Sequence, residues 1–341
     1  MATMKDIARR ANVSVATVSA VINQSRFVSK ELEERVKQVI RDLDYRPNDL
    51  ARALRQNLSR TIAYVLPSIT NPFFPEMLKG LQERMFANGY SVIVCNTDGD
   101  PARLKSYGLL FLTNRVDGVV VSSPGSAQLQ QIVQELGNAN VPVTVLHGPR
   151  SLNKADRVLT DDEEGGYQGT RHLISLQHKR IAFLGVQAST TSRFREAGYQ
   201  RAMSESTILT DSSLIHKGSD FSEQSGYQLA SMALSQSKQR PTALVAANDP
   251  MALGAVEACR TLGLSIPNEV SIVAFDDTLA PLVRPKLTSV SFPKYAMGEQ
   301  AAEFILHRLQ KAAANGHCQT VMAPALVVRE STIRCEQLRR V

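Results

Sequence analysis

Short apolar segments alternate with amphipathic segments from Thr61 onward, and this alternation restricts the fold more than any other feature of the sequence. The apolar segments are TIAYVLP, YSVIVCN, DGVVVSS, VPVTVLH, KRIAFLG, TALVAAND and VSIVAFDD, and helical segments such as 76–87, 127–136 and 251–262 lie between them. Strands separated by helices form parallel sheets that are covered on both faces. The expected total of about ten strands is too large for one small sheet. The sequence therefore predicts an α/β fold with two doubly wound parallel-sheet subdomains and a cleft between them.

Doubly wound sheets bind their ligands outside the carboxyl ends of the strands. The segments that follow the expected strands include SITNPFF, VQASTTSRFR, ANDP and FDDT. These loops combine hydroxyl, amide, carboxylate, guanidinium and aromatic side chains. We therefore expect a small-molecule site where they meet.

The first 46 residues have the pattern of three short helices. Thr3 and Asp6 fit a capping box for the first helix. Ser14 can cap a second helix that runs to about Asn23, and Ser29 can cap a third over 30–43. Apolar residues at helical spacing are expected to form a small core: Ile7, Ala8, Ala11, Val18, Val21, Ile22, Leu32, Val36, Val39, Ile40 and Leu43. The short connection between the first two helices is typical of a helix-turn-helix, whose second helix enters the major groove of DNA.

Positive charge is concentrated near the N-terminus. The first sixty residues hold twelve Lys and Arg against seven Asp and Glu, which accounts for five of the net charge of +7 on 341 residues. A basic N-terminal region joined to a nearly neutral remainder indicates a polyanionic partner at that end. The alternative is a basic face that serves solubility alone.

Cysteine usage and hydropathy indicate the compartment. The cysteines lie far apart without a C-x-x-C pair, so neither a zinc site nor a disulfide framework is expected. The start MATMKDIARR lacks the apolar segment of a signal peptide, and no apolar run is long enough to span a membrane. We therefore expect a cytoplasmic protein with no metal, no cofactor and no membrane partner.

The segment NDLARALRQN, residues 48–57, follows Pro47 and has weak helical character. Asn48 is a good helix N-cap, and Leu50 and Leu54 are neighbours at i, i+4. A helix this short is marginally stable in water by itself. We therefore expect the segment to become ordered against a partner.

Several motifs in the chain resemble the LacI/GalR family of bacterial transcription regulators. They are MKDIARRANVSVATVSAVIN, YRPNDLARALRQ, NPFF, RVDGVVV, RFREAGYQRAM, ANDPMALGA, FDDT and LVVREST, and they occur in the order usual for the family. The opening hundred residues are most similar to the ribose and purine repressors of that family. The resemblance implies a homodimer with DNA-binding headpieces, a hinge helix, and a core like that of periplasmic sugar-binding proteins, in which an effector alters operator affinity.

The resemblance also implies domain boundaries. The helix-turn-helix headpiece is expected over 1–46, the hinge helix and linker over 47–60, and the effector-binding and dimerisation core over 61–341. Within the core, the N-subdomain is expected over about 61–162 and 292–321, and the C-subdomain over about 163–291 and 322–341. The C-terminal RCEQLRRV carries no leucine heptads, which favours a dimer over a coiled-coil-linked tetramer.

The resemblance places base contacts on Val15, Ala16 and Ala20 of the second helix. These side chains donate no hydrogen bond, but they can pack against thymine methyl groups. Val15 could instead belong to the headpiece core. The hydroxyls of Ser14 and Thr17 suit phosphates. The full set of expected DNA-binding residues is Ser14, Val15, Ala16, Thr17, Ala20, Asn23, Arg26, Arg52, Leu54 and Arg55.

Leu54 falls on the hinge leucine that, in this family, wedges into the minor groove and kinks the DNA. The unstacking is offset by the contacts that a bend permits. The alternative is an ordinary amphipathic contact between Leu50 and Leu54. With so apolar a second helix, we expect methyl packing and DNA deformability to select the operator.

The resemblance places an effector site on the loops of the core. Arg195 matches the arginine that binds ligand oxygens, and Asn248 and Asp276 match its polar partners. The expected effector-binding residues are Phe73, Phe74, His147, Thr191, Arg195, Phe221, Asn248 and Asp276. Two positions depart from the family: Thr160 replaces the usual Asp, and His147 replaces an aromatic ligand wall. We read Asp161 to Glu164 as a solvated helix start rather than a metal loop.

Because of these two departures, the identity of the effector does not follow from the resemblance. A free sugar is expected first, because a carboxylate, an amide and a guanidinium can satisfy sugar hydroxyls. The segment STTSRFR at a helix N-terminus could hold a phosphate, so a phosphorylated sugar is an alternative. A purine or nucleoside acting as corepressor is another.

Two other protein classes share parts of this pattern. A sugar-processing enzyme is disfavoured, because G-x-G-x-x-G, G-x-x-x-x-G-K-[ST], G-x-S-x-G and H-E-x-x-H are all missing from the sequence. A transport-type sugar-binding protein would need a signal peptide and no basic headpiece. The resemblance therefore implies an effector-controlled repressor of a carbohydrate-utilisation operon, binding a pseudo-palindromic operator in double-stranded DNA.

Overall fold

The computed structural model forms two compact units, Met1–Ser59 and Arg60–Val341. It describes residues 2–23, 26–45, 58–114, 116–122, 127–148, 152, 154–187, 189–209, 211–235, 240–310 and 316–337. The expected hinge helix over 48–57 lies outside the described residues. Each unit is described below by itself.

The described residues of the first unit form helices α1 (Met4–Ala11), α2 (Val15–Asn23) and α3 (Lys30–Asp42). The predicted capping box between Thr3 and Asp6 is confirmed. Asn12 adopts a left-handed conformation, φ 50°, and ends α1, which allows α2 to begin three residues later. The Ser14 hydroxyl accepts a hydrogen bond from the Thr17 N–H at 3.0 Å, as an N-cap should.

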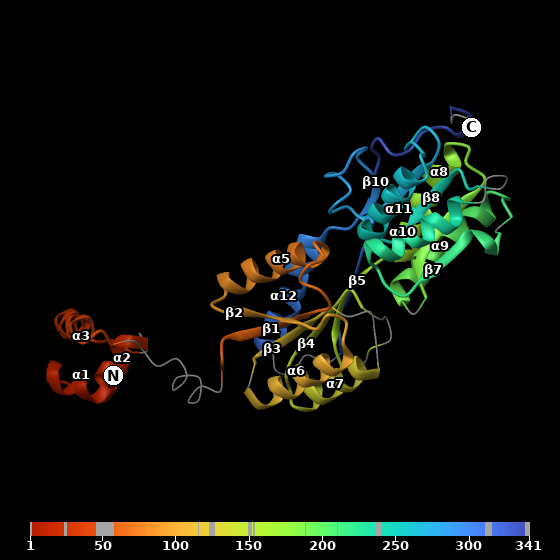
Figure 1. Ribbon diagram of the computed structural model, residues 1–341. Coiled ribbons are helices and arrows are strands. Elements are labelled where there is room, and N and C mark those ends of the chain that lie inside the picture. Colours follow the sequence, from red (N-terminus) through yellow and green to blue (C-terminus); the bar gives the residue numbers. More distant parts are fainter. Residues whose placement is uncertain are drawn as a thin grey trace. The chain divides into compact units, whose positions relative to one another are not determined.

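Helices α1, α2 and α3 lie together (Figure 1), and apolar side chains from each of them form the core of this unit. Its buried members are Ile7, Ala8, Ala11, Val18, Val21, Val36 and Val39. Two expectations were wrong in detail. Leu32 is half-buried and lies outside this core. Ser29 precedes α3, but its side chain makes no capping hydrogen bond, so its position at the helix start rests on backbone conformation alone.

The second unit contains two six-stranded sheets. The first sheet has the strand order β11-β5-β4-β3-β1-β2 and is parallel throughout. Figure 1 shows helices α5 and α12 on one face of this sheet and α6 and α7 on the other. The bounds are β1 Thr61–Leu66, α5 Phe73–Ala87, β2 Ser91–Asn96, α6 Pro101–Asn114, β3 Gly118–Val121, α7 Ala127–Asn138, β4 Val143–Leu146, β5 Asp156–Thr160, α12 Lys294–Gln310 and β11 Gln319–Met322.

The second sheet has the order β12-β10-β9-β8-β6-β7, and only the pair β10–β12 is antiparallel among its described strands. Helix α8 packs against α9, and α10 packs against α11. The bounds are α8 Asp162–Ser175, β6 Ile181–Val186, α9 Thr190–Glu205, η1 Ser212–Leu214, β7 Ile215–Gly218, α10 Glu223–Leu234, β8 Ala243–Ala246, α11 Asp249–Thr261, β9 Ser271–Asp276, β10 Thr288–Ser291, β12 Ala325–Val327 and η2 Cys335–Gln337.

The predicted α/β fold with two parallel-sheet subdomains is confirmed, and each of the seven apolar segments contains a strand. The sequence pattern did not indicate β5, β7, β10, β11 or β12. Strands β7, β11 and β12 are half-exposed, so they need no continuous apolar run. Strands β5 and β10 are buried but carry polar residues, DRVLT and TSVS, that form hydrogen bonds within the fold.

Candidate functional site

All eight residues that we expected to bind an effector line one cleft of about 540 Å³. They are Phe73, Phe74, His147, Thr191, Arg195, Phe221, Asn248 and Asp276. The cleft is also lined by Pro67, Ser68, Asn71, Asp98, Gly99, Val186, Ser189, Ser219 and Asp220. This volume is in the range that holds a small organic molecule.

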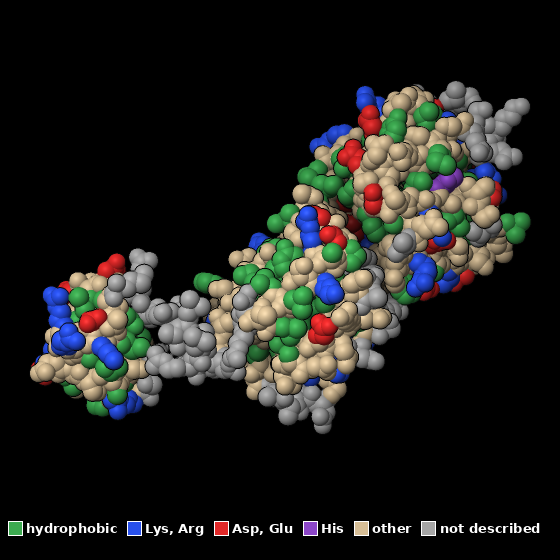
Figure 2. All heavy atoms as spheres, turned by 60° about the horizontal axis from the view of Figure 1, so that its bottom comes forward, with side chains coloured by type: hydrophobic (Ala, Val, Ile, Leu, Met, Phe, Trp, Pro, Cys, Tyr) green, Lys and Arg blue, Asp and Glu red, His purple; other side chains and the backbone are tan. Residues whose placement is uncertain are grey.

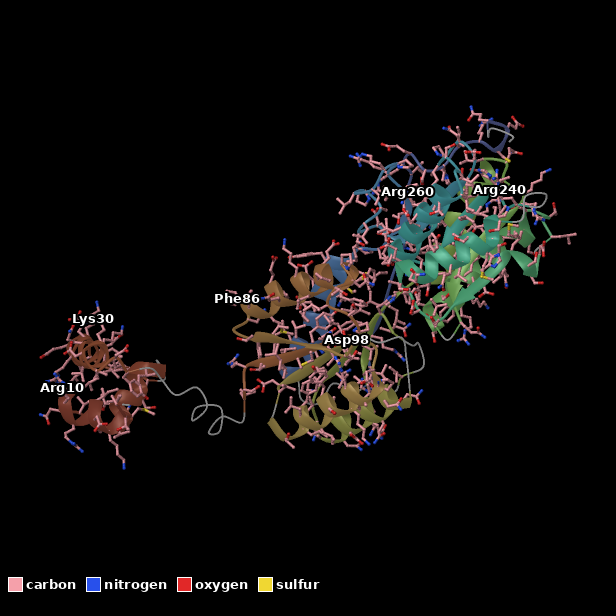
Figure 3. The ribbon with its side chains drawn as sticks, in the orientation of Figure 1. Arg10, Lys30, Phe86, Asp98, Arg240 and Arg260 are labelled. Carbon is pink, nitrogen blue, oxygen red and sulfur yellow. The ribbon has the colours of Figure 1, made fainter. Side chains whose placement is uncertain are left out.

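The cleft lies at the carboxyl ends of the strands in both sheets. From the first sheet it receives the segments after β1, β2 and β4, and from the second sheet the segments after β6, β7, β8 and β9. Asp98, labelled in Figure 3, follows β2. In each sheet the first strand of the subdomain lies between the second and the third, a doubly wound order that leaves a crevice at this end. The loop positions predicted from the sequence therefore meet in space.

Arg195, on α9, is 2% exposed and is held by two carboxylates. Its Nε donates a hydrogen bond to Asp162 Oδ1 at 2.9 Å, and its Nη1 donates to Asp276 Oδ1 at 3.3 Å and to the backbone carbonyl of Ala247. The guanidinium also stacks on Phe275, 4.5 Å from the ring centroid. Nη2 makes no hydrogen bond to the described part of the chain, so this nitrogen is available to a ligand.

Close helix packing holds Arg195 in place. A Cβ atom added to Gly166 on α8 would lie 2.0 Å from the backbone oxygen of Arg195. A Cβ atom added to Gly198 on α9 would lie 1.9 Å from the backbone oxygen of Glu163. Glycines at both crossing points therefore let the two helices approach until Arg195 reaches Asp162.

Asp162 was not predicted to take part in the site. The sequence pattern suggested that residues 161–164 begin a solvated helix, and Asp161 does cap α8 by accepting a hydrogen bond from the Glu164 N–H at 3.2 Å. Asp162, however, is 7% exposed and binds both Arg195 and Thr160. The expectation of a solvated start was wrong at this residue, because its carboxylate is buried against Arg195 and Thr160.

Asp276 ends β9 with a left-handed backbone, φ 89°, and is 5% exposed. Burial raises the pKa of its carboxyl to about 6, although the Arg195 guanidinium opposes this shift. A left-handed non-glycine residue is strained and persists where its surroundings hold it. Its carboxylate lines the cleft beside Arg195.

Asp249 organises the loop that follows Asp276, and the sequence analysis missed it. Its buried carboxylate accepts hydrogen bonds from the backbone N–H groups of Thr278, Leu279 and Ala280 at 2.6, 2.7 and 3.2 Å. Burial raises the pKa of this carboxyl. The neighbouring motif ANDP was the available signal, but a carboxylate that binds backbone thirty residues away leaves no local pattern.

Asn248 lines the cleft but is largely engaged by the protein. Its side-chain oxygen accepts a hydrogen bond from the Met251 N–H at 2.9 Å and so caps α11. Its Nδ2 donates to the backbone oxygen of Phe221 at 3.2 Å. Asn248 therefore lines the cleft, as expected, and also fixes the cleft wall that contains Phe221.

Aromatic rings supply the apolar walls. Phe73 is 3% exposed and Phe74 is 7% exposed, and their ring centroids are 5.4 Å apart. Asn71 holds the start of this segment, because its side-chain oxygen accepts a hydrogen bond from the Phe73 N–H at 3.0 Å. Phe221 is half-buried on the other subdomain. Flat apolar surfaces therefore face a cleft that polar side chains also line.

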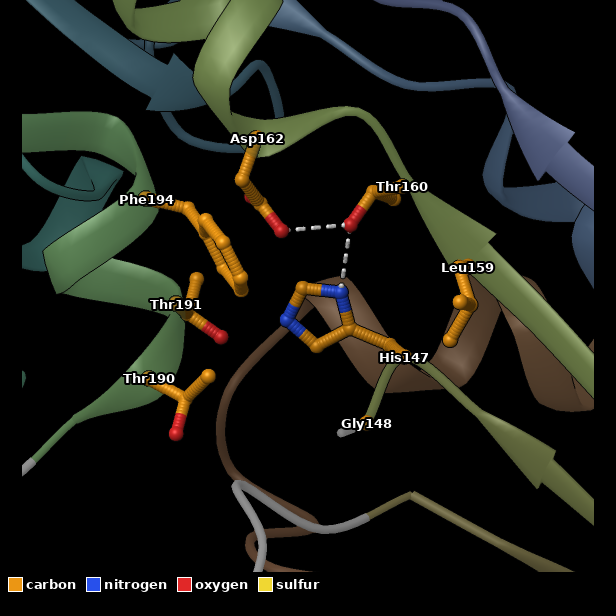
Figure 4. A pocket seen from close by; sticks show the side chains of 8 residues that line it. All are labelled: His147, Gly148, Leu159, Thr160, Asp162, Thr190, Thr191 and Phe194. Atoms are coloured by element: carbon orange, nitrogen blue, oxygen red, sulfur yellow. Dashed lines mark hydrogen bonds between the residues drawn. The ribbon is translucent and has the colours of Figure 1, made fainter. Parts of the chain in front are cut away.

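His147 and Thr160, the two departures from the family pattern, form a hydrogen bond with each other (Figure 4). His147 Nδ1 lies 3.0 Å from the Thr160 hydroxyl, which donates to Asp162 Oδ2 at 2.7 Å. His147 has a left-handed backbone, φ 54°, and its ring contacts Phe73 edge-on at 5.1 Å. Burial lowers the pKa of His147.

The segment STTSRFR divides between the cleft and the surface. Ser189 caps α9 by accepting a hydrogen bond from the Ser192 N–H at 3.2 Å, and Ser189, Thr191 and Arg195 line the cleft. Arg193 is exposed and is not among the cleft residues. Arg195 is the only Lys or Arg among the described residues that line this cleft.

The first unit presents a polar and basic surface. Ser14, Val15 and Ala16 are exposed at the start of α2, Val15 by 41%, and Thr17 is half-buried. Figure 2 shows Lys and Arg side chains gathered on the visible face of this unit, and in Figure 3 Arg10 and Lys30 extend away from its helices. Arg26 is also exposed. The start of α2 is therefore accessible to a polyanion.

Ala20 does not fit its expected role. It is 2% exposed, because a single methyl group close to the backbone is covered by its surroundings. A side chain in this position presents no surface to a base edge. The side chains of Asn23, Arg52, Leu54 and Arg55, which were also expected to bind DNA, lie outside the described residues.

Within the described ranges, no helix has both the length and the apolar character needed to cross a membrane. The same ranges contain no cluster of three or more His, Cys, Asp or Glu side chains that could hold a metal ion.

The sequence matches two protein families. Residues 3–48 match the family described as bacterial regulatory proteins, lacI family, and residues 170–332 match the periplasmic binding protein-like domain. The first match covers the helix-turn-helix unit, and the second covers most of the second sheet and its helices.

Known proteins are similar over nearly the whole chain. The HTH-type transcriptional repressor PurR of Haemophilus influenzae (strain PittEE) is 35% identical over 339 residues, which cover 97% of this chain and 98% of that protein. The lac repressor dimer bound to operator and the anti-inducer ONPF has a TM-score of 0.85 at 28% identity and covers 97% of this chain and 99% of its own. A LacI family transcriptional regulator from Enterococcus faecium with bound ribose has a TM-score of 0.69 at 28% identity, over 80% of this chain and 99% of its own.

These matches confirm the resemblance found in the sequence motifs. They cover both the helix-turn-helix unit and the two-sheet unit that contains the cleft. The chain belongs to the LacI family of bacterial regulatory proteins, DNA-binding transcriptional repressors with an effector-binding domain, and not to a family of enzymes.

Proposed function

We propose that this repressor controls a carbohydrate-utilisation operon and that its effector is an uncharged sugar bound in the cleft. The charge around Arg195 carries this proposal. Two buried carboxylates, Asp162 and Asp276, already bind its guanidinium. At neutral pH a carboxyl with a pKa of about 6 is mainly ionised. A phosphate or carboxylate ligand would therefore meet a site whose one cationic group is already neutralised, and the phosphorylated-sugar alternative is disfavoured.

The remaining groups of the cleft suit a polyhydroxylated ligand. Arg195 Nη2 can donate a hydrogen bond, the second carboxylate oxygen of Asp276 can accept one, and the hydroxyl of Thr191 can do either. The rings of Phe73, Phe74 and Phe221 can cover the apolar faces of a sugar. The Enterococcus faecium relative with bound ribose supports this ligand class.

A purine acting as corepressor is the second candidate. The observation that favours it is the 35% identity to PurR, whose name is that of a purine repressor, over nearly the full length of both chains. The aromatic walls would also accept a flat ring. The sugar is preferred because the polar groups of the cleft include both donors and acceptors on several sides.

The DNA-binding role is proposed for a homodimer whose headpieces, residues 1–46, bind the two halves of a pseudo-palindromic operator. Val15 and Ala16 pack against thymine methyls, and Ser14, Thr17 and Arg26 face phosphates. Ala20 is left out because it is buried. The hinge, residues 47–60, contributes Leu54 as a minor-groove wedge, with Asn23, Arg52 and Arg55 close to the backbone of the DNA. The repressor binds its operator in the cytoplasm.

Coupling between ligand and DNA follows from the position of the cleft. A ligand that contacts segments of both subdomains of the 61–341 core stabilises their closed arrangement, which is a shift of population. In the dimer, such closure changes the spacing of the two hinge segments. If these segments cannot pair, their folding on DNA is lost and the operator is released.

The test is fluorescence anisotropy of DNA from just upstream of this gene, titrated with the full-length protein at two salt concentrations. Each titration is repeated with pentoses, hexoses, sugar phosphates and purines. Tight binding that one neutral sugar abolishes is the expected result. Operator binding that appears only with a purine would show that the effector is a purine corepressor and not a sugar. Release by a sugar phosphate at lower concentration than by the free sugar would contradict the charge argument.

A further inference from the structure

A small cavity opens beside His147, next to the main cleft (Figure 4). It contains about 10 Å³ of free space, which is room for one water-sized group. Its wall includes Thr160 and Asp162 on one side and Thr191 and Phe194 on the other. A single hydroxyl group fits this space.

The hydrogen bonds behind His147 determine which ring nitrogen carries its proton. The Thr160 hydroxyl has one proton and donates it to Asp162 Oδ2 at 2.7 Å. Toward His147 Nδ1, 3.0 Å away, the same oxygen can therefore act only as an acceptor. Nδ1 must carry the ring proton. In the neutral ring, Nε2 is then an unprotonated acceptor.

His147 Nε2 faces the cavity. In Figure 4 it points toward Thr190 and Thr191 on the opposite wall. Neither His147 Nε2 nor the Thr191 hydroxyl forms a hydrogen bond with the described part of the chain. The charged groups that act on the ring are Asp162, behind Thr160, and Arg195, and burial lowers the pKa of His147. The neutral ring is therefore the form present at neutral pH.

We infer that His147 determines specificity by accepting a hydrogen bond from one ligand hydroxyl at Nε2, with its tautomer set by Thr160 and Asp162. The same hydroxyl accepts a hydrogen bond from Thr191. An acceptor oxygen presented to Nε2, such as an ether or carboxylate oxygen, is rejected because it leaves two lone pairs facing each other. This inference rests on the proposed function, and it adds the class of group that the ligand must present at this position.

The substitution His147→Asn tests the inference most directly. Asparagine tolerates the left-handed backbone that His147 adopts, φ 54°. Its amide nitrogen can occupy the place of Nδ1 and still donate to Thr160, but no atom reaches the place of Nε2. The matched control is His307→Asn, because His307 is exposed on α12 outside both cavities.

The experiment is calorimetric titration of the full-length protein with ribose, xylose, glucose and galactose, and then with each monodeoxy derivative of the sugar that binds. We expect the native sugar to bind the His147→Asn variant about tenfold more weakly than it binds the wild type. One monodeoxy derivative should show the same loss with the wild type and no further loss with the variant. The His307→Asn variant should behave as the wild type. Additive losses for every derivative would overturn the inference.

A second measurement separates this inference from the proposed sugar ligand. ¹⁵N NMR of the ligand-free protein, labelled at histidine and assigned with the His147→Asn variant, reports which ring nitrogen is protonated. Protonation at Nδ1 supports the inference even if none of the four sugars binds, in which case the ligand class is wrong. Protonation at Nε2 overturns the inference whatever binds.

Discussion

Lys294 donates a hydrogen bond from Nζ to the backbone oxygen of Asp276 at 2.7 Å. Lys294 begins α12, which packs on the first sheet, and Asp276 ends β9 in the second sheet. The lysine is 3% exposed, and its Nζ also lies 3.6 Å from the carboxylate oxygen Oε2 of Glu76 on α5. A buried ammonium therefore joins the strand end that carries a cleft carboxylate to the helices of the other subdomain.

We predict that Lys294→Met weakens both folding and ligand binding. The variant leaves a buried carbonyl without its donor, which costs about 1–3 kcal/mol. The Asp276 backbone should then lose its fixed orientation, so ligand affinity should fall as well. Thermal unfolding and calorimetric titration measure the two effects. Lys79→Met, on the exposed side of α5, is the control, and equal behaviour of the two variants would refute a role for Lys294.

We predict that Arg195→Ala abolishes effector binding and also destabilises the second unit. Removing the guanidinium leaves Asp162 and Asp276 buried without their partner, and breaking a buried ion pair in this way costs about 3–5 kcal/mol. Denaturant unfolding measures the stability and titration measures the binding. Operator binding without effector should be retained wherever the variant is folded. Unchanged stability would show that the two carboxylates have another partner.

We predict a pH dependence of stability that depends on Asp276. Its folded pKa is raised to about 6 from the usual 3.8, so the folded state binds a proton more tightly than the unfolded state. The contribution of this group to stability is fully present below pH 3.8 and is lost as the pH rises through about 6. Asp276→Asn should remove this step from a plot of unfolding free energy against pH. A step of equal size in the variant would assign the titration to another group.

We predict that Val15 recognises a thymine methyl in the operator. Replacing thymine by uracil removes that methyl and nothing else from the base edge. One such replacement should weaken operator binding by the wild type and have no effect on binding by Val15→Ala. Anisotropy titration with each uracil-substituted operator provides the comparison. If every replacement affects the two proteins equally, Val15 does not contact a thymine.

We predict that Leu54→Ala weakens operator binding and leaves effector affinity nearly intact, because a minor-groove wedge acts on DNA alone. Anisotropy titration measures operator binding and calorimetry measures effector affinity. Replacing Leu50 by Ala is the matched change on the same segment. Equal loss of operator and effector binding in the Leu54 variant would place this leucine in the fold of the core instead.

The sequence by itself determined the elements and their class. Apolar segments such as VSIVAFDD and the cap at Thr3 are local patterns, and local backbone preferences and burial decide their structure. The family motifs also allowed the eight cleft residues to be named together, because each ends or follows a strand whose carboxyl end opens on the same crevice. Strands without an apolar run, such as β7, could not be predicted from the sequence pattern, because they form by pairing with a neighbouring strand.

The tertiary structure decided which groups are charged, paired and accessible. Arg195 is bound to residues 33 and 81 positions away in the chain, and no local pattern encodes such a pairing. The burial of Ala20 and Asp162 and the proton position on His147 likewise depend on what packs around them. Periodicity acts over one or two helical turns, whereas burial and hydrogen bonding depend on distance in space. The sequence therefore located the cleft, and only the fold determined the polarity that it presents to a ligand.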